Sequence, residues 1–145
     1  MSEIIILSGI PCAGKSTWAE KQGKIVLSLD KYRESLFNKY VYSKENEKLV
    51  KDNLYADLDY CVIRNQDVII DNTHCKEGLL DKFIKEYGST NKIVIKFFDI
   101  SLWKSLYRNI IRYLKTGEYI PIDSIVQFHK NYKKINREKY AKYTR

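Results

Sequence analysis

The sequence has few of the features that mark membrane-spanning, secreted or metal-binding proteins. Its apolar runs all fall short of the roughly 18 residues of a transmembrane helix, so no membrane partner is expected. The segment MSEIIILSG has no positive charges before its apolar residues, which argues against a signal peptide. The cysteines, Cys12, Cys61 and Cys75, form no close pair and no metal-ligand spacing. We therefore expect free thiols in the reducing cytoplasm and no zinc site.

Proline and glycine are also scarce, with two prolines and six glycines in 145 residues. The chain contains no Pro/Gly-rich linker, internal repeat or low-complexity tract that would mark a domain boundary. We therefore predict a single domain over residues 1–145, a length that can bury one hydrophobic core. A composition of 44% hydrophobic and 30% charged residues is typical of a soluble globular protein.

Acidic residues are scarce where basic residues are most frequent. Residues 1–101 carry 15 basic and 15 acidic side chains, whereas residues 102–145 carry 11 basic and 3 acidic ones. The last segment therefore supplies the whole formal net charge of +8. Such a segment attracts polyanions over a Debye length of about 8–10 Å. A solvated basic helix and tail would explain the same charge.

The apolar residues alternate between strand-like and helix-like patterns. The expected strands are residues 3–7, 24–29, 67–70 and 92–98. The expected helices are residues 15–21, 30–37, a longer stretch from Ser43 to Val62, 77–86, 101–114 with Ser101 as its cap, and 123–134. This alternation predicts an α/β fold in which helices flank a central four-stranded parallel sheet. In such sheets, ligands bind at the carboxyl ends of the strands.

The segment after the first expected strand matches a phosphate-binding loop. GIPCAGKST fits the Walker A pattern G-x-x-x-x-G-K-[ST], and it lies between an apolar strand and a helix. In such a loop, backbone N–H groups and the lysine surround the β- and γ-phosphates of ATP, while the serine hydroxyl binds Mg²⁺. We therefore predict ATP as the phosphate donor and Ser16 as the metal-binding residue. The expected nucleotide-binding residues are Gly9, Pro11, Cys12, Ala13, Gly14, Lys15, Ser16 and Thr17.

Asp30 follows the second expected strand and begins a helix. It is therefore either a helix N-cap or the base that orients an acceptor hydroxyl group. Because phosphoryl transfer has a loose transition state, placing that hydroxyl in line matters more than a high pKa of the base. Arg33, one turn later, can face the same crevice and hold an acceptor phosphate, or it is an exposed helical arginine.

Polar residues follow the third expected strand. Asp71 can hold a magnesium-bound water, and Asn72 and Thr73 can hydrogen-bond the acceptor. Polar residues also begin ordinary loops, and His74 is expected to be a loop residue rather than an acid or base.

Two arginines four residues apart, Arg108 and Arg112, lie on one face of the fifth expected helix. With the turn after them they predict a helical lid over residues 108–120 that closes on ATP and stabilises the charge of the transferring phosphoryl group. Two surface arginines are the alternative.

The basic C-terminal tail, residues 133–145, interleaves cations with Tyr140 and Tyr143, and Tyr132 precedes it. This mixture suits a single nucleic acid strand, whose bases stack on rings and whose phosphates meet cations. A solubilising, partly frayed tail is the alternative.

Together these segments resemble the kinase domain of polynucleotide 5′-hydroxyl kinases, P-loop kinases of nucleic acid end-repair found in bacteriophages. The resemblance rests on GIPCAGKSTWAE, LDKYRESL, IIDNTH, LDKFIKEYG, KFFDISLWKSLYRNIIR and IPIDSIVQFHKNY, between Ile4 and Tyr132. It implies a P-loop kinase fold and transfer of the γ-phosphate of ATP to the 5′-OH end of DNA or RNA.

For the site, the resemblance implies Asp30 as general base and Arg33 on the acceptor phosphate. It also implies Lys15, Ser16 and Thr17 on ATP and Mg²⁺, and Arg112, with Arg108, on the donor phosphates. Either Asp71 or Asn72 takes the place of the family's acceptor-site aspartate.

Two features depart from the family. Leu29 stands where the phage enzyme has a basic residue, so the acceptor preference can differ. The length of 145 residues also leaves no room for that enzyme's C-terminal phosphatase domain. Two other functions stay open: a P-loop kinase of a nucleoside, sugar or antibiotic hydroxyl, and a non-catalytic nucleic-acid-binding module that uses ATP.

Overall fold

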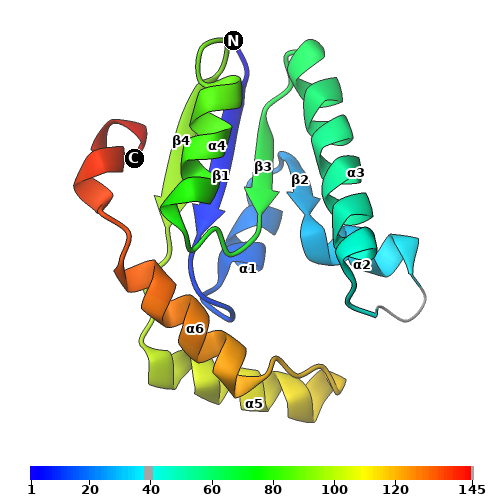
Figure 1. Cartoon of the computed structure of the whole chain (residues 1–145), viewed down its shortest axis with the longest axis vertical. Coiled ribbons are helices and arrows are strands. Elements are labelled where there is room, and N and C mark those ends of the chain that lie inside the picture. Colours follow the sequence, from blue (N-terminus) through cyan, green and yellow to red (C-terminus); the bar gives the residue numbers. More distant parts are fainter. Residues whose placement is uncertain (38–40, 145) are drawn as a thin grey trace.

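A computed structural model describes residues 1–37 and 41–144. Its centre is a four-stranded sheet in which all paired strands are parallel, with the order β2-β3-β1-β4 (Figure 1). The strands are β1 (Glu3–Ser8), β2 (Ile25–Ser28), β3 (Val68–Asp71) and β4 (Lys92–Phe97). The predicted α/β class and parallel sheet are confirmed, and each expected strand end lies within one residue of the observed one.

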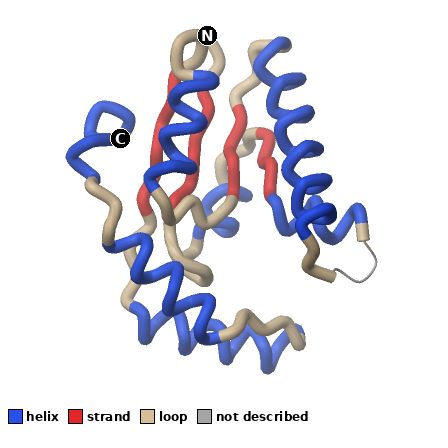
Figure 2. Tube along the Cα trace, viewed as in Figure 1, coloured by secondary structure: helices blue, strands red, loops and turns tan. Residues whose placement is uncertain are grey.

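Helices cover both faces of the sheet and the carboxyl ends of its strands. They are α1 (Lys15–Glu20), α2 (Leu29–Leu36), α3 (Lys44–Ile63), α4 (Glu77–Tyr87), α5 (Leu102–Thr116), α6 (Ile122–Lys133) and the 3-10 helix η1 (Arg137–Tyr143). In Figures 1 and 2, α3 and α4 lie in front of the sheet and α1 lies behind it. The pair α5 and α6 lies beyond the carboxyl ends of the strands. No helix in the described ranges has both the length and the apolar character needed to cross a bilayer.

The strand β1 shows why the centre of the sheet is buried on both faces. Ile4 and Ile6 belong to the core that the sheet forms with α3 and α4. Ile5 and Leu7 belong to the smaller core on the other face, together with Ala19 of α1. Because side chains alternate across a strand, a strand covered on both faces has to be apolar at successive positions.

Three helix starts can be compared with their predictions. The Oγ of Ser43 accepts a hydrogen bond from the Asn46 N–H at 3.0 Å, and the Oγ of Ser101 accepts one from the Lys104 N–H at 3.1 Å, so both are side-chain caps. Asp30 is not an N-cap, which corrects that alternative: α2 begins one residue earlier, after Ser28, and Asp30 lies in its first turn. Leu29 is buried in the core and is the first residue of the helix.

The alternative of a partly frayed tail is wrong for residues 137–144, because η1 packs against the sheet and α4. Tyr140 is 1% exposed, and its hydroxyl donates to Asp81 Oδ1 at 2.7 Å. Thr144 forms a parallel bridge with Ile95 of β4, and Arg137 pairs with Asp99. A buried Tyr140 has no free ring face, so it cannot stack on a nucleic acid base.

Candidate functional site

The carboxyl ends of β1, β2 and β3 open into a cavity of about 1000 Å³. Segments from both halves of the chain line it, because the carboxyl ends of parallel strands meet at one edge of the sheet. Of the predicted site residues, those that line it are Pro11, Cys12, Ala13, Gly14, Lys15, Ser16, Thr17, Asp30, Arg33, Asp71, Asn72, Thr73, Arg108 and Arg112. Phe128 of α6, which the sequence analysis did not single out, also lines this cavity.

Gly9 begins the loop but does not line the cavity. Its N–H donates to the Thr73 carbonyl oxygen at 2.9 Å, which ties the start of the loop to the end of β3. A Cβ atom at this position would lie 3.0 Å from Phe98 Cβ. A glycine is therefore needed here for close packing.

The loop itself requires a glycine at its end. Gly14 has φ +92°, a left-handed conformation that L side chains rarely adopt, and it is the N-cap of α1. The first N–H groups of a helix have no intrahelical acceptor and are available to an anion. Because Lys15, Ser16 and Thr17 begin this helix and line the cavity, the loop can bind phosphate oxygens.

Lys15 is buried, and its ammonium group is held by the loop. Its Nζ donates to the carbonyl oxygens of Gly9 and Ile10, both at 2.8 Å. Burial lowers the pKa of Lys15, while the nearby Cys75 and Asp71 act to raise it. The cation is thus placed at the loop before any phosphate binds.

Ser16 and Asp71 join the loop to the end of β3. The Ser16 hydroxyl donates to Asp71 Oδ2 at 2.7 Å. A hydroxyl and a carboxylate oxygen are ligands that Mg²⁺ accepts, and Mg²⁺ is usually bound by one or two protein groups together with waters and substrate phosphates. The two side chains therefore fit a magnesium site next to the phosphate loop.

Asp30 and Arg33 form an ion pair, and both residues line the cavity. Arg33 Nη1 donates to Asp30 Oδ1 at 2.7 Å, and the Asp30 side chain is 78% exposed. Its carboxylate is therefore accessible to a ligand in the cavity.

A second carboxylate holds the same guanidinium. Arg33 Nε and Nη2 donate to the two Glu47 oxygens at 2.9 and 3.0 Å, and the Glu47 side chain is only 15% exposed. Burial acts to lower the pKa of Arg33, but the bonds and charges of Glu47 and Asp30 outweigh it and raise that pKa.

Glu47 was missed by the sequence analysis. It lies in the first turn of α3, where acidic residues are common because they interact favourably with the helix dipole. Nothing local distinguishes it from Glu45 in the same turn. Only the packing of α3 beside α2 brings it to Arg33.

The two arginines of α5 have different partners. Arg108 Nη1 donates to the Cys12 carbonyl oxygen of the loop at 3.0 Å. Arg112 Nη2 donates to Glu118 Oε2 at 2.7 Å, and this bond raises the pKa of Arg112. Both side chains line the cavity, but Arg112 is held by an acidic partner that the sequence analysis did not identify.

His74 is buried beneath the site and does not line the cavity. Its φ is +41°, and its Nδ1 lies 2.6 Å from the Leu7 carbonyl oxygen. Ser8 Oγ donates to the His74 carbonyl oxygen at 2.8 Å. Burial lowers the pKa of the ring to about 4. His74 therefore fastens the segment after β3 to β1, as a neutral structural residue.

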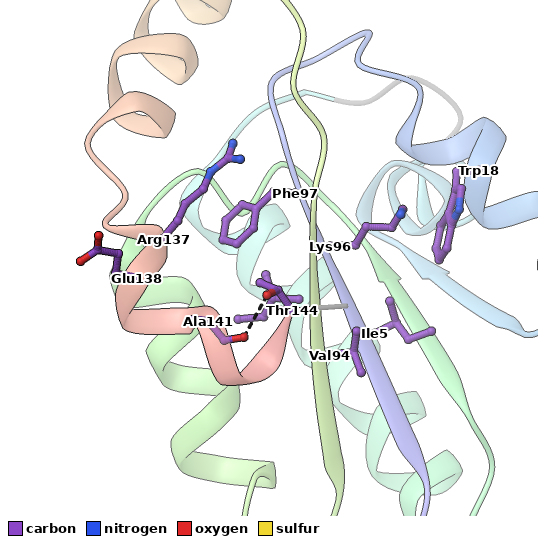
Figure 3. Close-up of a pocket in the computed structure, with 10 residues that line it drawn as sticks. Ile5, Trp18, Val94, Lys96, Phe97, Arg137, Glu138, Ala141 and Thr144 are labelled. Carbon is purple, nitrogen blue, oxygen red and sulfur yellow. Dashed lines mark hydrogen bonds between the residues drawn. The ribbon is translucent and has the colours of Figure 1, made fainter.

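A second cavity, of about 540 Å³, lies beside β4 (Figure 3). In Figure 3, Trp18 lies on one side of the strand and Arg137 and Glu138 of η1 lie on the other. The Lys96 ammonium lies 5.0 Å from the Trp18 ring centroid. None of the predicted catalytic or acceptor-binding residues lines this cavity.

Comparison with known proteins identifies the family and the fold. A family model described as an AAA domain matches residues 4–135. The chain is similar to one in a structure of the Pnkp1/Rnl/Hen1 RNA repair complex, with a TM-score of 0.83 and 24% identity, over 91% of this chain and 44% of that chain. A second structure of the Pnkp1/Rnl/Hen1 complex matches with a TM-score of 0.68 and 24% identity, over 74% of this chain and 38% of that chain.

A gluconokinase from Sinorhizobium meliloti 1021 matches with a TM-score of 0.59 and 13% identity, over 98% of this chain and 79% of that chain. In the Pnkp1/Rnl/Hen1 structures, by contrast, the chain spans less than half the length of the two matched chains. Identities this low establish the fold alone, and it is the P-loop kinase fold that the sequence predicts.

Proposed function

This chain belongs to the AAA domain family, and we propose that it is an ATP-dependent polynucleotide 5′-hydroxyl kinase. One observation carries the proposal. A phosphate-binding loop with Lys15 and an exposed carboxylate, Asp30, paired with Arg33 line the same cavity, and the charge of Asp30 acts to raise the pKa of Lys15. A kinase whose acceptor carries a phosphate needs three groups: a site for the donor phosphates, a base for the acceptor hydroxyl and a cation for the acceptor's own phosphate.

The donor site is the loop from Gly9 to Thr17. The N–H groups at the start of α1 bind the β- and γ-phosphates of ATP, and Lys15 transfers its hydrogen bonds from the loop carbonyls to phosphate oxygens. Ser16 and Asp71 hold Mg²⁺, which neutralises charge on the donor phosphates. Arg108 and Arg112 belong to a lid over residues 108–120 and contact the transferring group.

The acceptor site is built around Asp30. Its carboxylate accepts the proton of the 5′-hydroxyl as that oxygen bonds to the γ-phosphorus. The bond from this phosphorus to the bridging oxygen breaks, and ADP leaves. Arg33, held by Glu47, binds the phosphate that follows the 5′ nucleoside. Because Asp71 is bonded to Ser16, we assign the acceptor contact to Asn72 with Thr73.

The test is transfer of labelled γ-phosphate from ATP to a panel of acceptors. The panel contains 5′-OH DNA, 5′-OH RNA, nucleoside 3′-phosphates, free nucleosides and gluconate. We expect labelling of the acceptors that carry a phosphate. Labelling of only the free nucleosides or gluconate would instead assign the site to small-molecule kinases, the second candidate.

The base is tested by Asp30→Asn. We expect transfer to fall on the order of 10²- to 10³-fold, because the amide cannot accept the hydroxyl proton, with ATP binding retained. Glu34→Gln, at an exposed position one turn later on α2, is the matched control and should keep the wild-type rate. Transfer by Asp30→Asn at the wild-type rate would refute this mechanism.

A further inference from the structure

The second cavity, beside β4, has the size and the lining of a small-molecule site. Its volume is about 540 Å³. Ligand pockets usually measure about 300–1,000 Å³, and they are mostly apolar, with a few polar groups that fix the orientation of the ligand. The apolar part of this lining consists of Ile5, Trp18, Val94, Ile95, Phe97 and Ala141. The charged groups of the cavity therefore indicate which kind of ligand it takes.

Lys96 is a cation of this cavity without an acidic partner. In residues 1–37 and 41–144, its ammonium group forms no ion pair and no hydrogen bond with another side chain, and its contacts are with two rings. The nitrogen lies 5.0 Å from the Trp18 ring centroid and 5.5 Å from the Phe98 ring centroid. A ring face attracts a cation, but an ammonium group also has three N–H donors for oxygen acceptors. The oxygen atoms of an anion would supply these acceptors.

The other charges that line the cavity do not neutralise Lys96. Arg137 is paired with Asp99, so its own charge is balanced. In Figure 3, the Glu138 carboxylate points away from β4, whereas Lys96 extends toward Trp18 on the other side of the strand. The part of the cavity around Lys96 is therefore positively charged.

The groups around Lys96 suit an aromatic ring. Ile5 and Val94 belong to the smaller core, against which Trp18 packs, and all three lie on the same side of β4 as Lys96 (Figure 3). An aromatic ring packs on aliphatic groups and makes edge-to-face or offset contacts with another ring. We propose that the second cavity binds a small aromatic anion, with its ring against Trp18 and Val94 and its anionic group on the Lys96 ammonium. This site does not depend on the proposed kinase activity.

Trp18 also lines the first cavity, where anions can bind to other cations. A test therefore has to separate the two cavities. Lys96 does so, because it lines the second cavity and not the first.

The probe is naphthylacetate, and the control ligand is naphthylethanol, which has the same ring but no charge. The indole N–H signals of isotope-labelled protein report binding in NMR spectra, and Trp103→Phe assigns them, because Trp18 and Trp103 are the two tryptophans. We expect naphthylacetate to shift the Trp18 signal until saturation and to leave the Trp103 signal in place, since Trp103 does not line the cavity. Naphthylethanol should bind about ten-fold more weakly, because it lacks the charge-assisted bonds.

Lys96→Met removes the charge and keeps a long side chain. This variant should bind naphthylacetate about ten-fold more weakly than the wild type. Its affinity for naphthylethanol should be unchanged, which also shows that the variant is folded. Lys92→Met, at the start of the same strand but outside the cavity, is the matched control and should keep the wild-type affinity for both ligands.

Three results would overturn the proposal. The first is the lack of a saturable Trp18 shift with naphthylacetate at millimolar concentrations, the range expected for a ligand of this size. The second is equal affinity of wild type and Lys96→Met for naphthylacetate, which would place the anion in the first cavity. The third is an equal loss of affinity in Lys96→Met and Lys92→Met, which would mean that only the overall charge of the strand matters.

Discussion

Arg33 lies between two carboxylates that differ in exposure. The Glu47 side chain is 15% exposed and accepts two bonds from Arg33, whereas the Asp30 side chain is 78% exposed and accepts one. Under the proposed function, Glu47 is a positioning residue that fixes the plane of the guanidinium. We expect Glu47→Gln to raise the KM for a nucleoside 3′-phosphate about ten-fold, because a neutral amide replaces one charge-assisted bond of the pair. The kcat should change much less.

Steady-state kinetics with acceptors that carry or lack the 3′-phosphate measure the separate effects on KM and kcat. Glu45→Gln, at an exposed position in the same turn of α3, is the control and should leave both constants unchanged. An equal loss for both acceptors would mean that Glu47 acts on the fold rather than through Arg33.

His74 predicts a pH dependence of stability. Its folded-state pKa is about 4, below the ordinary value of 6.5, because burial disfavours the charged ring. As the pH falls, His74 therefore binds a proton at a higher pH in the unfolded chain than in the folded protein. The contribution of His74 is complete above pH 6.5 and is lost toward pH 4, by about 2 kcal/mol between pH 7 and pH 5.

Urea unfolding at the two pH values tests this. Asn tolerates a positive φ, so His74→Asn removes the titrating ring with little backbone strain and should flatten the pH dependence. His129→Asn on α6, where the ring is only partly buried and burial lowers its pKa too, should keep most of the wild-type slope. Equal slopes in wild type and His74→Asn would contradict the assignment.

Single residues differ in how far the sequence predicts them. The loop residues lie in a motif whose spacing is set by the phosphates themselves, so they could be named in advance. Glu47 and Glu118 could not, because their roles come from packing and from a turn that local sequence does not specify. Asp30 was expected at the site, and it does line the cavity. One expectation made it the N-cap of the second helix, but it is the second helical residue, because the buried Leu29 begins α2.

At the scale of elements, α5 is fastened to the phosphate loop by the Ser105 hydroxyl on the Pro11 carbonyl. Ser105→Ala removes this bond, worth about 1 kcal/mol. We therefore expect the affinity for a non-hydrolysable ATP analogue to fall about five-fold. Isothermal titration calorimetry measures it, with Ser89→Ala at an exposed position in the turn after α4 as the control. An unchanged affinity would mean that the loop keeps its shape without α5.

The elements were predicted well where periodicity reflects burial within the chain. The central strands β1 and β3 are buried on both faces, so each is a short apolar run. The same reasoning failed for η1. Its Tyr140 is buried, and its hydroxyl bonds Asp81 of α4, which is far away in the sequence. It also did not predict that Trp103, Tyr107 and Leu114 of α5 are exposed.

At the scale of the whole molecule, the charge excess lies in residues 102–145. If these cations bind the acceptor strand, the affinity for a single-stranded oligonucleotide should fall with salt, with a log–log slope of about −0.7 per phosphate contact. Replacing Lys130, Lys133 and Lys134 with Gln should therefore make the slope less negative by about 2. Fluorescence anisotropy at several salt concentrations measures it.

The control variant replaces Lys44, Lys51 and Lys85 with Gln, which removes the same charge from α3 and α4. Its salt slope should remain that of the wild type. Identical slopes for both triple variants would show that only the total charge matters. The C-terminal lysines would then not contact the phosphates of the oligonucleotide.

The parallel sheet also determines when the protein can fold. Ile4 of β1 pairs with Val68 on one side and with Ile93 on the other. The strand of this sheet that is synthesised first must therefore wait, exposed and apolar, until both of its partners have been synthesised. Such distant pairings slow folding and leave an unpaired strand open to aggregation. A nascent chain arrested before β4 would have β1 open along one edge, and would be a natural client for chaperones.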